Sequence, residues 1–258
     1  MASVLTQPVR FAGSRGQKLA GTLTTPGAQP PVAWALFAHC FTCHRNYKVI
    51  SYIARRLAAR GLGSLRFDFT GLGESSGHFE DTNLTTNIED VLSAARFLAE
   101  NHGAARLLLG HSLGAAAMFG AGLELPDARC LVTISAPFEP QNTLQLVESS
   151  VEAMLAEPER IFQVPVMGRP MPFKAQFGLD LRRHDVPATI ARWRRPLLIC
   201  HSPIDAITPW GQAEKIYQTA AQPKSLLSLG DTDHLVSSRA AAEWLGDLIA
   251  AWSMRYLG

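Results

Sequence analysis

The stretch ARLLLGHSLGAAAMF, residues 105–119, decides the fold of this chain. Its first five residues are mostly apolar and suit a buried strand, its last five suit a helix, and the pattern G-x-S-x-G lies between them. A serine on so sharp a turn has strained backbone angles, so Gly110 and Gly114 must lack side chains. The alternative is a glycine-rich turn that serves only close packing. We expect Ser112 to be raised above the end of a sheet strand as a nucleophile.

Apolar runs alternate with helical patterns on both sides of this stretch. Short apolar runs without polar alternation are typical of parallel strands buried on both faces. They occur at residues 32–38, 65–69, 107–109, 130–134, 197–200 and 226–229, after a possible hairpin of 9–11 and 19–23. Thr86 and Glu89 suggest a capping box at the start of one helix. The chain is therefore expected to form an α/β fold, a mostly parallel twisted sheet with helices on both faces.

Length and composition limit the possible classes of protein. The 258 residues are 47% apolar and 18% charged, which suits one large domain spanning 1–258 with a substantial core. The net charge of +2 is too mild to imply nucleic acid. Because we see no secretion signal, and because the apolar runs reach about half the length of a membrane span, we expect no membrane partner. The sequence gives no indication of oligomeric state.

One long segment interrupts the alternation of strands and helices. Residues 139–195 contain a helix-like piece at 144–155 and then a proline-broken run, 163–173, that could form a small hairpin turning at Gly168. The segment is too long for an ordinary connection between a helix and a strand. We interpret it as a cap inserted over the strand ends. The alternative is an irregular surface excursion without contact to substrate.

A serine hydroxyl needs a base, and that base needs an acid to orient it. Asp205 follows the apolar run 197–200, and His234 follows the run 226–229. The order serine, acid, histidine is the order of this fold, and parallel strands bring their carboxyl ends to one edge of the sheet. Asp231 and Asp233 remain weaker candidates for the acid. We expect His201 to hydrogen-bond the acid loop.

An oxyanion hole is predicted between the end of the run 32–38 and the residue after the serine. Phe41 and Leu113 are the candidate donors of the two backbone N–H groups. Cys40 and Cys43 share this loop, but a redox pair would need a thioredoxin-like context and a zinc site a second pair of ligands. We therefore expect neither a redox pair nor a metal, and no cofactor. Cys130 and Cys200 are expected in the core, and a reducing cytoplasm is the simplest location.

These motifs give the chain a resemblance to the α/β-hydrolase superfamily over nearly its whole length. The segments that carry it are Ala38 to Cys43, Arg66 to Ser75, Gly110 to Gly114, Asp205 and Asp233-His234. Many members have glycine where this chain has Cys40. The sequence is most similar to the hydrolase half of bacterial two-part proteins whose other half is an OsmC-like peroxidase domain. We expect this chain to lack that second half, so the resemblance implies a hydrolase activity and not a peroxidase.

The predicted function is a serine hydrolase that cleaves carboxylic esters of short to medium acyl chains through an acyl-enzyme. Phe41, His111, Met167 and Phe173 are the residues expected to line an apolar substrate pocket. A thioesterase and an aminopeptidase-like amide hydrolase could use the same groups. A non-catalytic ligand-binding module on a hydrolase scaffold is the alternative of a different class. The expected ligand is a small acyl ester.

Overall fold

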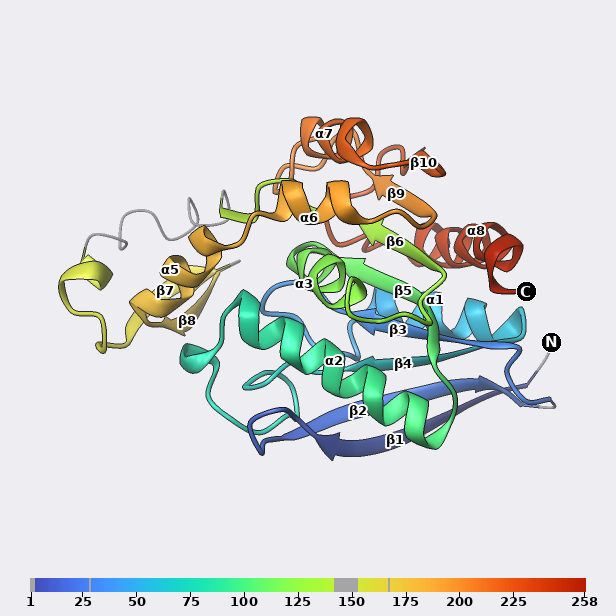
Figure 1. Ribbon diagram of the computed structural model, residues 1–258, viewed down its shortest axis with the longest axis horizontal. Helices are drawn as coiled ribbons and strands as arrows, with labels where there is room; N and C mark the ends of the chain where they lie inside the picture. The colour runs from blue at the N-terminus through green and yellow to red at the C-terminus, as the bar shows by residue number, and fades with distance from the viewer. Residues whose placement is uncertain (1–2, 28, 142–152, 167) are drawn as a thin grey trace.

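A computed structural model of the chain describes residues 3–27, 29–141, 153–166 and 168–258. Its centre is an eight-stranded sheet in the order β1-β2-β4-β3-β5-β6-β9-β10 (Figure 1). The strands are β1 (Val4–Ala12), β2 (Lys18–Pro26), β3 (Ala33–Ala38), β4 (Leu62–Phe67), β5 (Ala105–His111), β6 (Cys130–Ile134), β9 (Leu197–His201) and β10 (Lys224–Ser228). β1 and β2 pair antiparallel, as does β2 with β4, and all the other neighbours are parallel. The fold is that of an α/β-hydrolase, as predicted.

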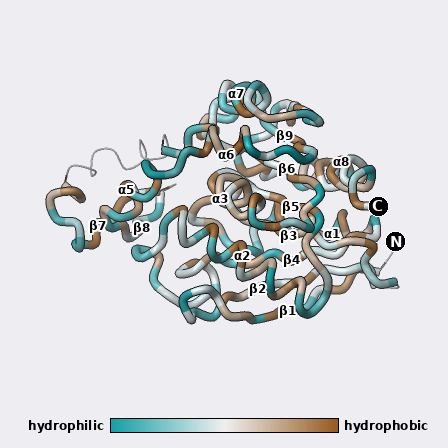
Figure 2. Tube along the Cα trace, in the orientation of Figure 1, coloured by the Kyte–Doolittle hydropathy of each residue, from teal (hydrophilic) through white to brown (hydrophobic). Residues whose placement is uncertain are grey.

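Helices cover both faces of this sheet. The helices are α1 (Lys48–Ala59), α2 (Leu84–Asn101), α3 (Leu113–Gly122), α5 (Ala175–Arg183), α6 (Val186–Arg192), α7 (Gly211–Thr219) and α8 (Arg239–Leu257), with a 3-10 turn η1 (Phe79–Asp81). α1 and α8 lie together on one face, while α2, α3, α6 and α7 lie on the other (Figure 1). β3, β6 and β9 are buried along their whole length, and β5 is buried at every residue except Arg106, which explains the apolar runs of these strands (Figure 2).

The segment between β6 and β9 contains a separate two-stranded sheet. β7 (Phe162–Val166) pairs antiparallel with β8 (Arg169–Phe173), and Gly168 between them has a φ of 77°, so the predicted hairpin is present. Figure 1 shows β7, β8 and α5 at one end of the molecule, beyond α2. The predicted helix-like piece at 144–155 falls largely on residues 142–152, which lie outside the described part of the chain.

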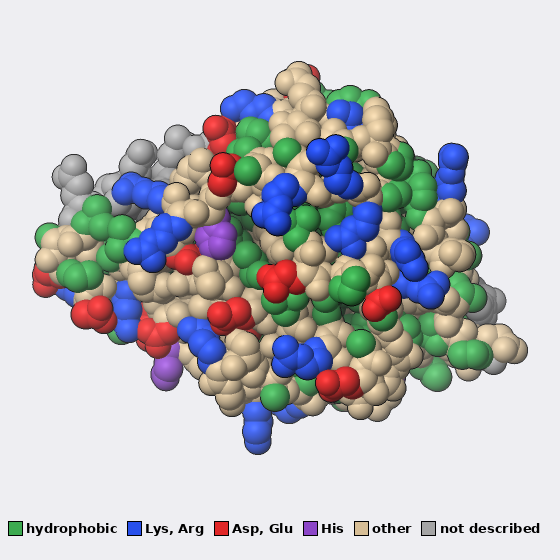
Figure 3. Space-filling model, viewed as in Figure 1, with side chains coloured by type: hydrophobic (Ala, Val, Ile, Leu, Met, Phe, Trp, Pro, Cys, Tyr) green, Lys and Arg blue, Asp and Glu red, His purple; other side chains and the backbone are tan. Residues whose placement is uncertain are grey.

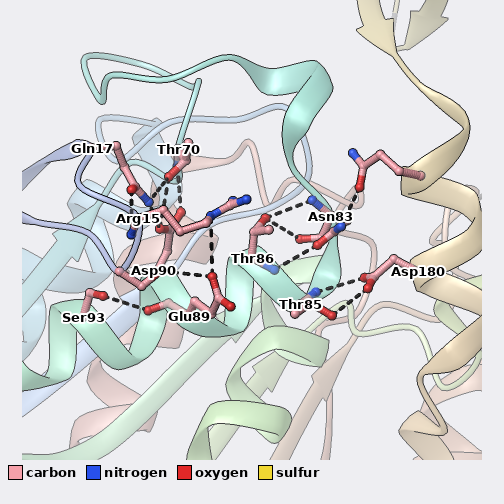
Figure 4. A network of polar contacts seen from close by, with 12 residues as sticks. Arg15, Gln17, Thr70, Asn83, Thr85, Thr86, Glu89, Asp90, Ser93 and Asp180 are labelled. Carbon is pink, nitrogen blue, oxygen red and sulfur yellow. Dashed lines mark hydrogen bonds and ion pairs between the residues drawn. The ribbon is translucent and has the colours of Figure 1, made fainter. Parts of the chain in front are cut away.

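Polar side chains attach this segment to the start of α2. The amide of Asn83 contacts Gln176, and Thr85 donates its hydroxyl proton to Asp180 at 2.6 Å (Figure 4). Lys174 forms an ion pair of 2.6 Å with Asp81. α5 is therefore held beside η1 and α2 although the two regions are far apart in sequence.

The start of α2 differs from the predicted capping box. The helix begins at Leu84 with Asn83 as its N-cap, and Asn83 exchanges hydrogen bonds with Thr86 in a capping box one turn earlier than expected. The prediction that paired Thr86 with Glu89 is wrong because an asparagine three residues upstream provides the cap. Glu89 instead binds Ser14 and Arg15 across the sheet edge (Figure 4).

Charged side chains are dispersed over the surface. Both signs occur on the face drawn in Figure 3, with Lys and Arg more frequent in its upper right part and Asp and Glu more frequent at the lower left. None of the described helices has both the length and the apolar composition that crossing a bilayer requires.

Candidate active site

Ser112 lies on the turn between β5 and α3 in a conformation that few residues adopt. Its φ is 54° and its ψ is −127°. A Cβ on Gly110 would lie 2.3 Å from the Cα of Ala115, and one on Gly114 would lie 2.3 Å from the carbonyl oxygen of His39. Both glycines are therefore required by close backbone approach, as the motif predicts. The backbone N–H of Ser112 donates to Ile134 at 2.8 Å, which fixes the turn to β6.

The structure brings Ser112, His234 and Asp205 into one hydrogen-bonded chain. The Nε2 of His234 lies 3.1 Å from the hydroxyl oxygen of Ser112, and its Nδ1 lies 2.7 Å from a carboxylate oxygen of Asp205. With its proton on Nδ1, the ring donates to Asp205 and accepts from Ser112. All three residues are at most 8% exposed. They come from the loops after β5, β9 and β10, which the parallel sheet brings to one edge.

Asp205 is held as a carboxylate by its surroundings. Burial alone would raise its pKa, but the hydrogen bond and charge of His234 and the N–H groups of Thr208 and Ile207 outweigh burial, so the pKa is lowered. Those two N–H groups donate to the other carboxylate oxygen at 2.8 and 2.9 Å. His201 donates to the carbonyl of Thr208 at 2.7 Å, which places it on the acid loop as predicted.

The two weaker candidates for the acid lie elsewhere. Asp233 accepts a hydrogen bond from the backbone N–H of Ser237 at 2.7 Å, and both Asp231 and Asp233 are exposed. The carboxylate that contacts the imidazole of His234 is that of Asp205.

His111 lies in the core and lines none of the described cavities, so its predicted place in a substrate pocket stays a prediction. Its side chain is fully buried, its ring lies 5.5 Å from that of His234, and its Nε2 donates to the His234 carbonyl at 2.9 Å. Burial lowers its pKa to about 3, so the ring is neutral at physiological pH. It packs beneath the base because the residue before Ser112 points into the sheet. Met167, another predicted pocket residue, lies outside the described residues.

The loop after β3 carries the predicted oxyanion donor Phe41. Its first residue, His39, accepts a hydrogen bond from the N–H of Phe69 at 3.3 Å. At its far end Arg45 forms a buried ion pair with Asp68, which also accepts the N–H of Arg45 at 2.6 Å. Gly114 of α3 packs on the carbonyl of His39. The loop is therefore fixed at both ends and lies against the helix that begins with Leu113.

Cys40 and Cys43 form a disulfide within this loop, with Cα atoms 5.4 Å apart. This bond was not predicted from the sequence, and the expectation that the two cysteines are not a redox pair stays a prediction. Thr42, between them, has a φ of 60°, which folds the four residues into a turn closed by a Cys43 N–H to Cys40 C=O bond of 3.1 Å. Their spacing could have indicated the pairing, because two intervening residues in a turn place the cysteines within bonding distance. Cys130 and Cys200 are free and buried, as predicted.

Aromatic side chains close a narrow cavity beside this loop. Phe41, Leu113 and Gly114 line it from the core, and Phe177 lines it from α5. The ring of Phe41 lies 5.3 Å from that of Phe177 and 5.8 Å from that of Phe173. Phe173 is almost fully buried and contacts the other rings of this cluster. Both candidate oxyanion residues therefore face one apolar cavity.

Comparison with known proteins places the chain among the hydrolases. It is 37% identical to the esterase domain of a Rhodothermus marinus protein. The match covers 98% of this chain and 100% of that domain, and the two structures superpose with a TM-score of 0.78. Est1E from Butyrivibrio proteoclasticus shares the fold at 18% identity and a TM-score of 0.78, over 96% of this chain and 99% of that one. A monoacylglycerol lipase of Mycolicibacterium smegmatis is 30% identical over 131 residues, 49% of this chain and 45% of the lipase.

The family model described as serine aminopeptidase, S33, matches residues 29–166, just over half of the chain. Together with the esterase and lipase relatives, this match identifies the protein as a serine hydrolase of carboxylesterase type. The chain belongs to the serine aminopeptidase S33 family of α/β-hydrolases.

Proposed function

We propose that the protein hydrolyses carboxylic esters of short to medium acyl chains, with Ser112 as nucleophile, His234 as general base and Asp205 as the acid that orients the base. The hydrogen-bonded chain of 3.1 and 2.7 Å through these three side chains is the observation that carries the proposal. The geometry lies within the range that nucleophile and base show in such enzymes.

In the first half of the reaction, the hydroxyl oxygen of Ser112 attacks the ester carbonyl while Nε2 of His234 takes its proton. The imidazolium that forms is stabilised by the carboxylate of Asp205, which keeps its charge because its pKa is lowered. His234 then gives the proton to the departing alcohol. In the second half, His234 removes a proton from water, which attacks the acyl-enzyme, and returns that proton to the oxygen of Ser112 as the acid leaves.

The oxyanion of each tetrahedral intermediate binds the backbone N–H groups of Phe41 and Leu113. Leu113 is the first residue of α3, whose N-terminus carries a partial positive charge. Each donor of this kind is worth roughly 10²–10³ in kcat. The contacts of His39, Arg45 and Gly114 described above support this role because they hold the two donors against each other.

Residues 139–195 act as a small cap over the substrate. The position of α5 beside η1 and the packing of Phe173 and Phe177 on Phe41 support this proposal. The cavity that these rings enclose has only about 10 Å³ of space and is lined mainly by apolar side chains, which favours short acyl chains over long ones. The esterase and lipase relatives are consistent with an ester substrate.

An aminopeptidase would need an acidic group to bind the substrate amine. Glu139 is engaged by Lys215 at 2.8 Å, and Glu148 and Glu152 lie outside the described residues. A ligand-binding module would have no need for the complete chain of hydrogen bonds at Ser112. An ester hydrolase is therefore the function that we favour.

Two measurements test the proposal. A fluorophosphonate probe should label the wild-type protein and leave Ser112→Ala unlabelled, and a series of p-nitrophenyl esters from acetate to palmitate should be cleaved fastest at the short to medium lengths. Acyl thioesters and aminoacyl p-nitroanilides serve as competing substrates in the same assay. Absence of labelling in the folded wild type, or rates that rise steadily to palmitate, would contradict the proposal.

A further inference from the structure

The disulfide of Cys40 and Cys43 lies inside the loop that carries the oxyanion donor. The two cysteines bracket Phe41 and Thr42, so the S–S bond closes the turn from which the N–H of Phe41 is presented. Thr42 adopts a left-handed conformation that costs energy for a β-branched residue. A covalent link helps to hold such a conformation, because opening it would allow Thr42 to relax.

The same disulfide separates two cavities. Cys40 lines the narrow cavity that contains Phe41 and Leu113. Cys43 lines a second cavity of about 150 Å³, whose other walls are Thr42, His44, Tyr47, Val166, Arg169 and Leu235. His44 and Arg169 are exposed, so this outer cavity is reached from solvent. A small molecule in it would lie beside the disulfide without entering the narrow cavity.

The charge of the outer cavity selects the kind of molecule that it would take. Its lining includes the guanidinium of Arg169 and the imidazole of His44, and it includes no carboxylate. Within the described ranges, no acidic side chain forms an ion pair with Arg169. A compact anion of a size near 150 Å³ is therefore favoured over a neutral or cationic molecule.

The other two cysteines provide an internal contrast. Cys130 and Cys200 lie in the core with no exposed surface, and burial raises the pKa of Cys130 to about 12 and that of Cys200 further still. Thiols of this kind are inert because the thiolate is the reactive form. Cys40 and Cys43 are also largely buried, at 3% and 7% exposed, but Cys43 lines the outer cavity and the pair lies next to the proposed reacting groups.

We propose that the Cys40–Cys43 disulfide is a thiol-exchange site for small anionic thiols, and that the disulfide form is the more active esterase. The claim of a thiol-exchange site concerns the outer cavity alone. The claim about esterase activity rests on the proposed function of Phe41 as an oxyanion donor. Reduction opens the turn, and the N–H of Phe41 loses part of its fixed position.

The exchange proceeds in two balanced steps. A thiolate RS⁻ attacks the Sγ of Cys43, the Sγ–Sγ bond breaks, and Cys40 leaves as a thiolate that takes up a proton. A second RS⁻ attacks the mixed disulfide on Cys43, which releases RSSR and leaves Cys43 as a thiol after protonation. Two thiols are thereby oxidised, and they supply the two electrons that reduce the protein disulfide.

The esterase arm measures kcat on p-nitrophenyl acetate before and after reduction. Excess thiol is removed by anaerobic gel filtration, since thiols cleave this substrate themselves. Titration of denatured protein should find two free thiols before reduction and four after it. We expect reduction to lower kcat at least about fivefold, which is part of the contribution that one oxyanion donor makes to kcat. Reoxidation with diamide should restore kcat. An unchanged or higher kcat in fully reduced protein would overturn the regulatory half.

The binding arm compares 2-mercaptoethanesulfonate with cysteamine at equal thiolate concentration. Mass spectrometry follows the mixed disulfide and the four-thiol product. The anionic thiol should reduce the protein several-fold faster, and Arg169→Ala should abolish the difference, whereas Arg160→Ala on the same hairpin segment should keep it. Equal rates for both thiols in the wild type, or four free thiols in air-purified protein, would overturn the exchange site.

Two further variants separate this inference from the proposed function. Cys40→Ser/Cys43→Ser should have the kcat of reduced wild type and no response to thiols, while Cys130→Ser should respond as wild type does. Because the reduced wild type needs no substitution, a misfolded double variant leaves the experiment intact. Fluorophosphonate labelling of the oxidised protein tests the esterase separately, so the failure of either idea is recognised by itself.

Discussion

At the scale of single residues, backbone geometry prepares the site before any side chain acts. Ser112 occupies a region of φ and ψ that costs on the order of 1–3 kcal/mol, and the surrounding turn maintains it. The sequence predicted this residue and its glycines, because the requirement is local. It did not predict the hydrogen bond of His111 to the carbonyl of His234, because that contact joins residues distant in sequence.

The role of Asp205 can be tested by comparison with Asp233, the residue that precedes His234 in the sequence. Asp205→Asn should lower kcat by up to about 10⁴-fold, because the amide favours the wrong tautomer of His234. Asp233→Asn is the matched control, since that carboxylate binds only the N–H of Ser237 among the described contacts. Steady-state kinetics on p-nitrophenyl acetate measure both. A comparable loss in both variants would refute the assignment of the acid.

Gly114 should be essential for activity. In Gly114→Ala the new Cβ would meet the carbonyl oxygens of His39 and Ala38 at 2.3 and 2.6 Å, so Leu113 and the Phe41 loop must separate. We expect kcat to fall by about 10²-fold or more, the value of one oxyanion donor. Gly120→Ala, where the Cβ meets the flexible end of Ile88, should keep kcat within about threefold. Similar kinetics for the two variants would argue against this picture.

At the scale of elements, polar contacts decide where loops and helix ends lie. The loop 39–45 is fixed by His39 and by Arg45, both of which contact the segment after β4. The helix α2 begins one turn before the predicted capping box because Asn83 competes with Thr86 for the cap. Such choices depend on small energies between similar caps, so patterns in a sequence place an element well and its first residue poorly.

The buried ion pair of Arg45 and Asp68 should be among the larger stabilising contacts of this loop. Asp68→Asn leaves the buried Arg45 without its carboxylate partner and should lower the free energy of unfolding by about 3–5 kcal/mol. Glu74→Gln removes the exposed partner of the same arginine and should cost less than about 1 kcal/mol. Urea unfolding followed by circular dichroism measures both, and equal losses would contradict the expectation.

The aromatic cluster should set the length of the acyl chain. Phe177→Ala removes a ring that lines the narrow cavity, so kcat/KM for hexanoate relative to acetate should rise about threefold or more, a change of under 1 kcal/mol in transition-state binding. Phe162→Ala, on the same segment but outside that lining, should leave the ratio unchanged. Both variants should lose stability, so each is assayed below its own melting temperature. An unaltered ratio in Phe177→Ala would exclude this cavity as the acyl site.

At the scale of the whole molecule, the fold and three site residues follow from the sequence because they depend on repeated local patterns. The parallel strands, the hairpin at Gly168 and the convergence of Ser112, Asp205 and His234 could all be predicted. The spacing of Cys40 and Cys43 allows a disulfide but does not decide for it, since the same spacing suits a reduced pair. The packing of Phe177 against Phe41 could not be predicted either, because it joins residues distant in sequence.

The buried histidines should make global stability depend on pH. Burial lowers the pKa of His39 to about 4 and that of His111 to about 3, from 6.5 in the unfolded chain. Below pH 6.5 the unfolded state binds more protons than the folded state. The free energy of unfolding therefore decreases as the pH is lowered from 6.5 to the pKa values of the folded protein.

Each of these histidines contributes a slope of up to about 1.4 kcal/mol per pH unit. In urea titrations at pH 7 and pH 5, His111→Gln should reduce the difference, since glutamine keeps a donor for the His234 carbonyl and cannot be protonated. His78→Gln, at an exposed site, should leave the difference as in wild type. An unchanged pH dependence in His111→Gln would show that this ring is charged in the folded protein.

Ser112 follows β5, whereas Asp205 and His234 follow β9 and β10, so residues 139–195 contribute none of the three. A library of foreign segments grafted between β6 and β9 would thus vary which molecules are admitted while the bond-breaking groups stay untouched. Under the proposed mechanism, selectivity and chemistry can evolve separately in this protein, because the chain encodes them in different stretches of its length.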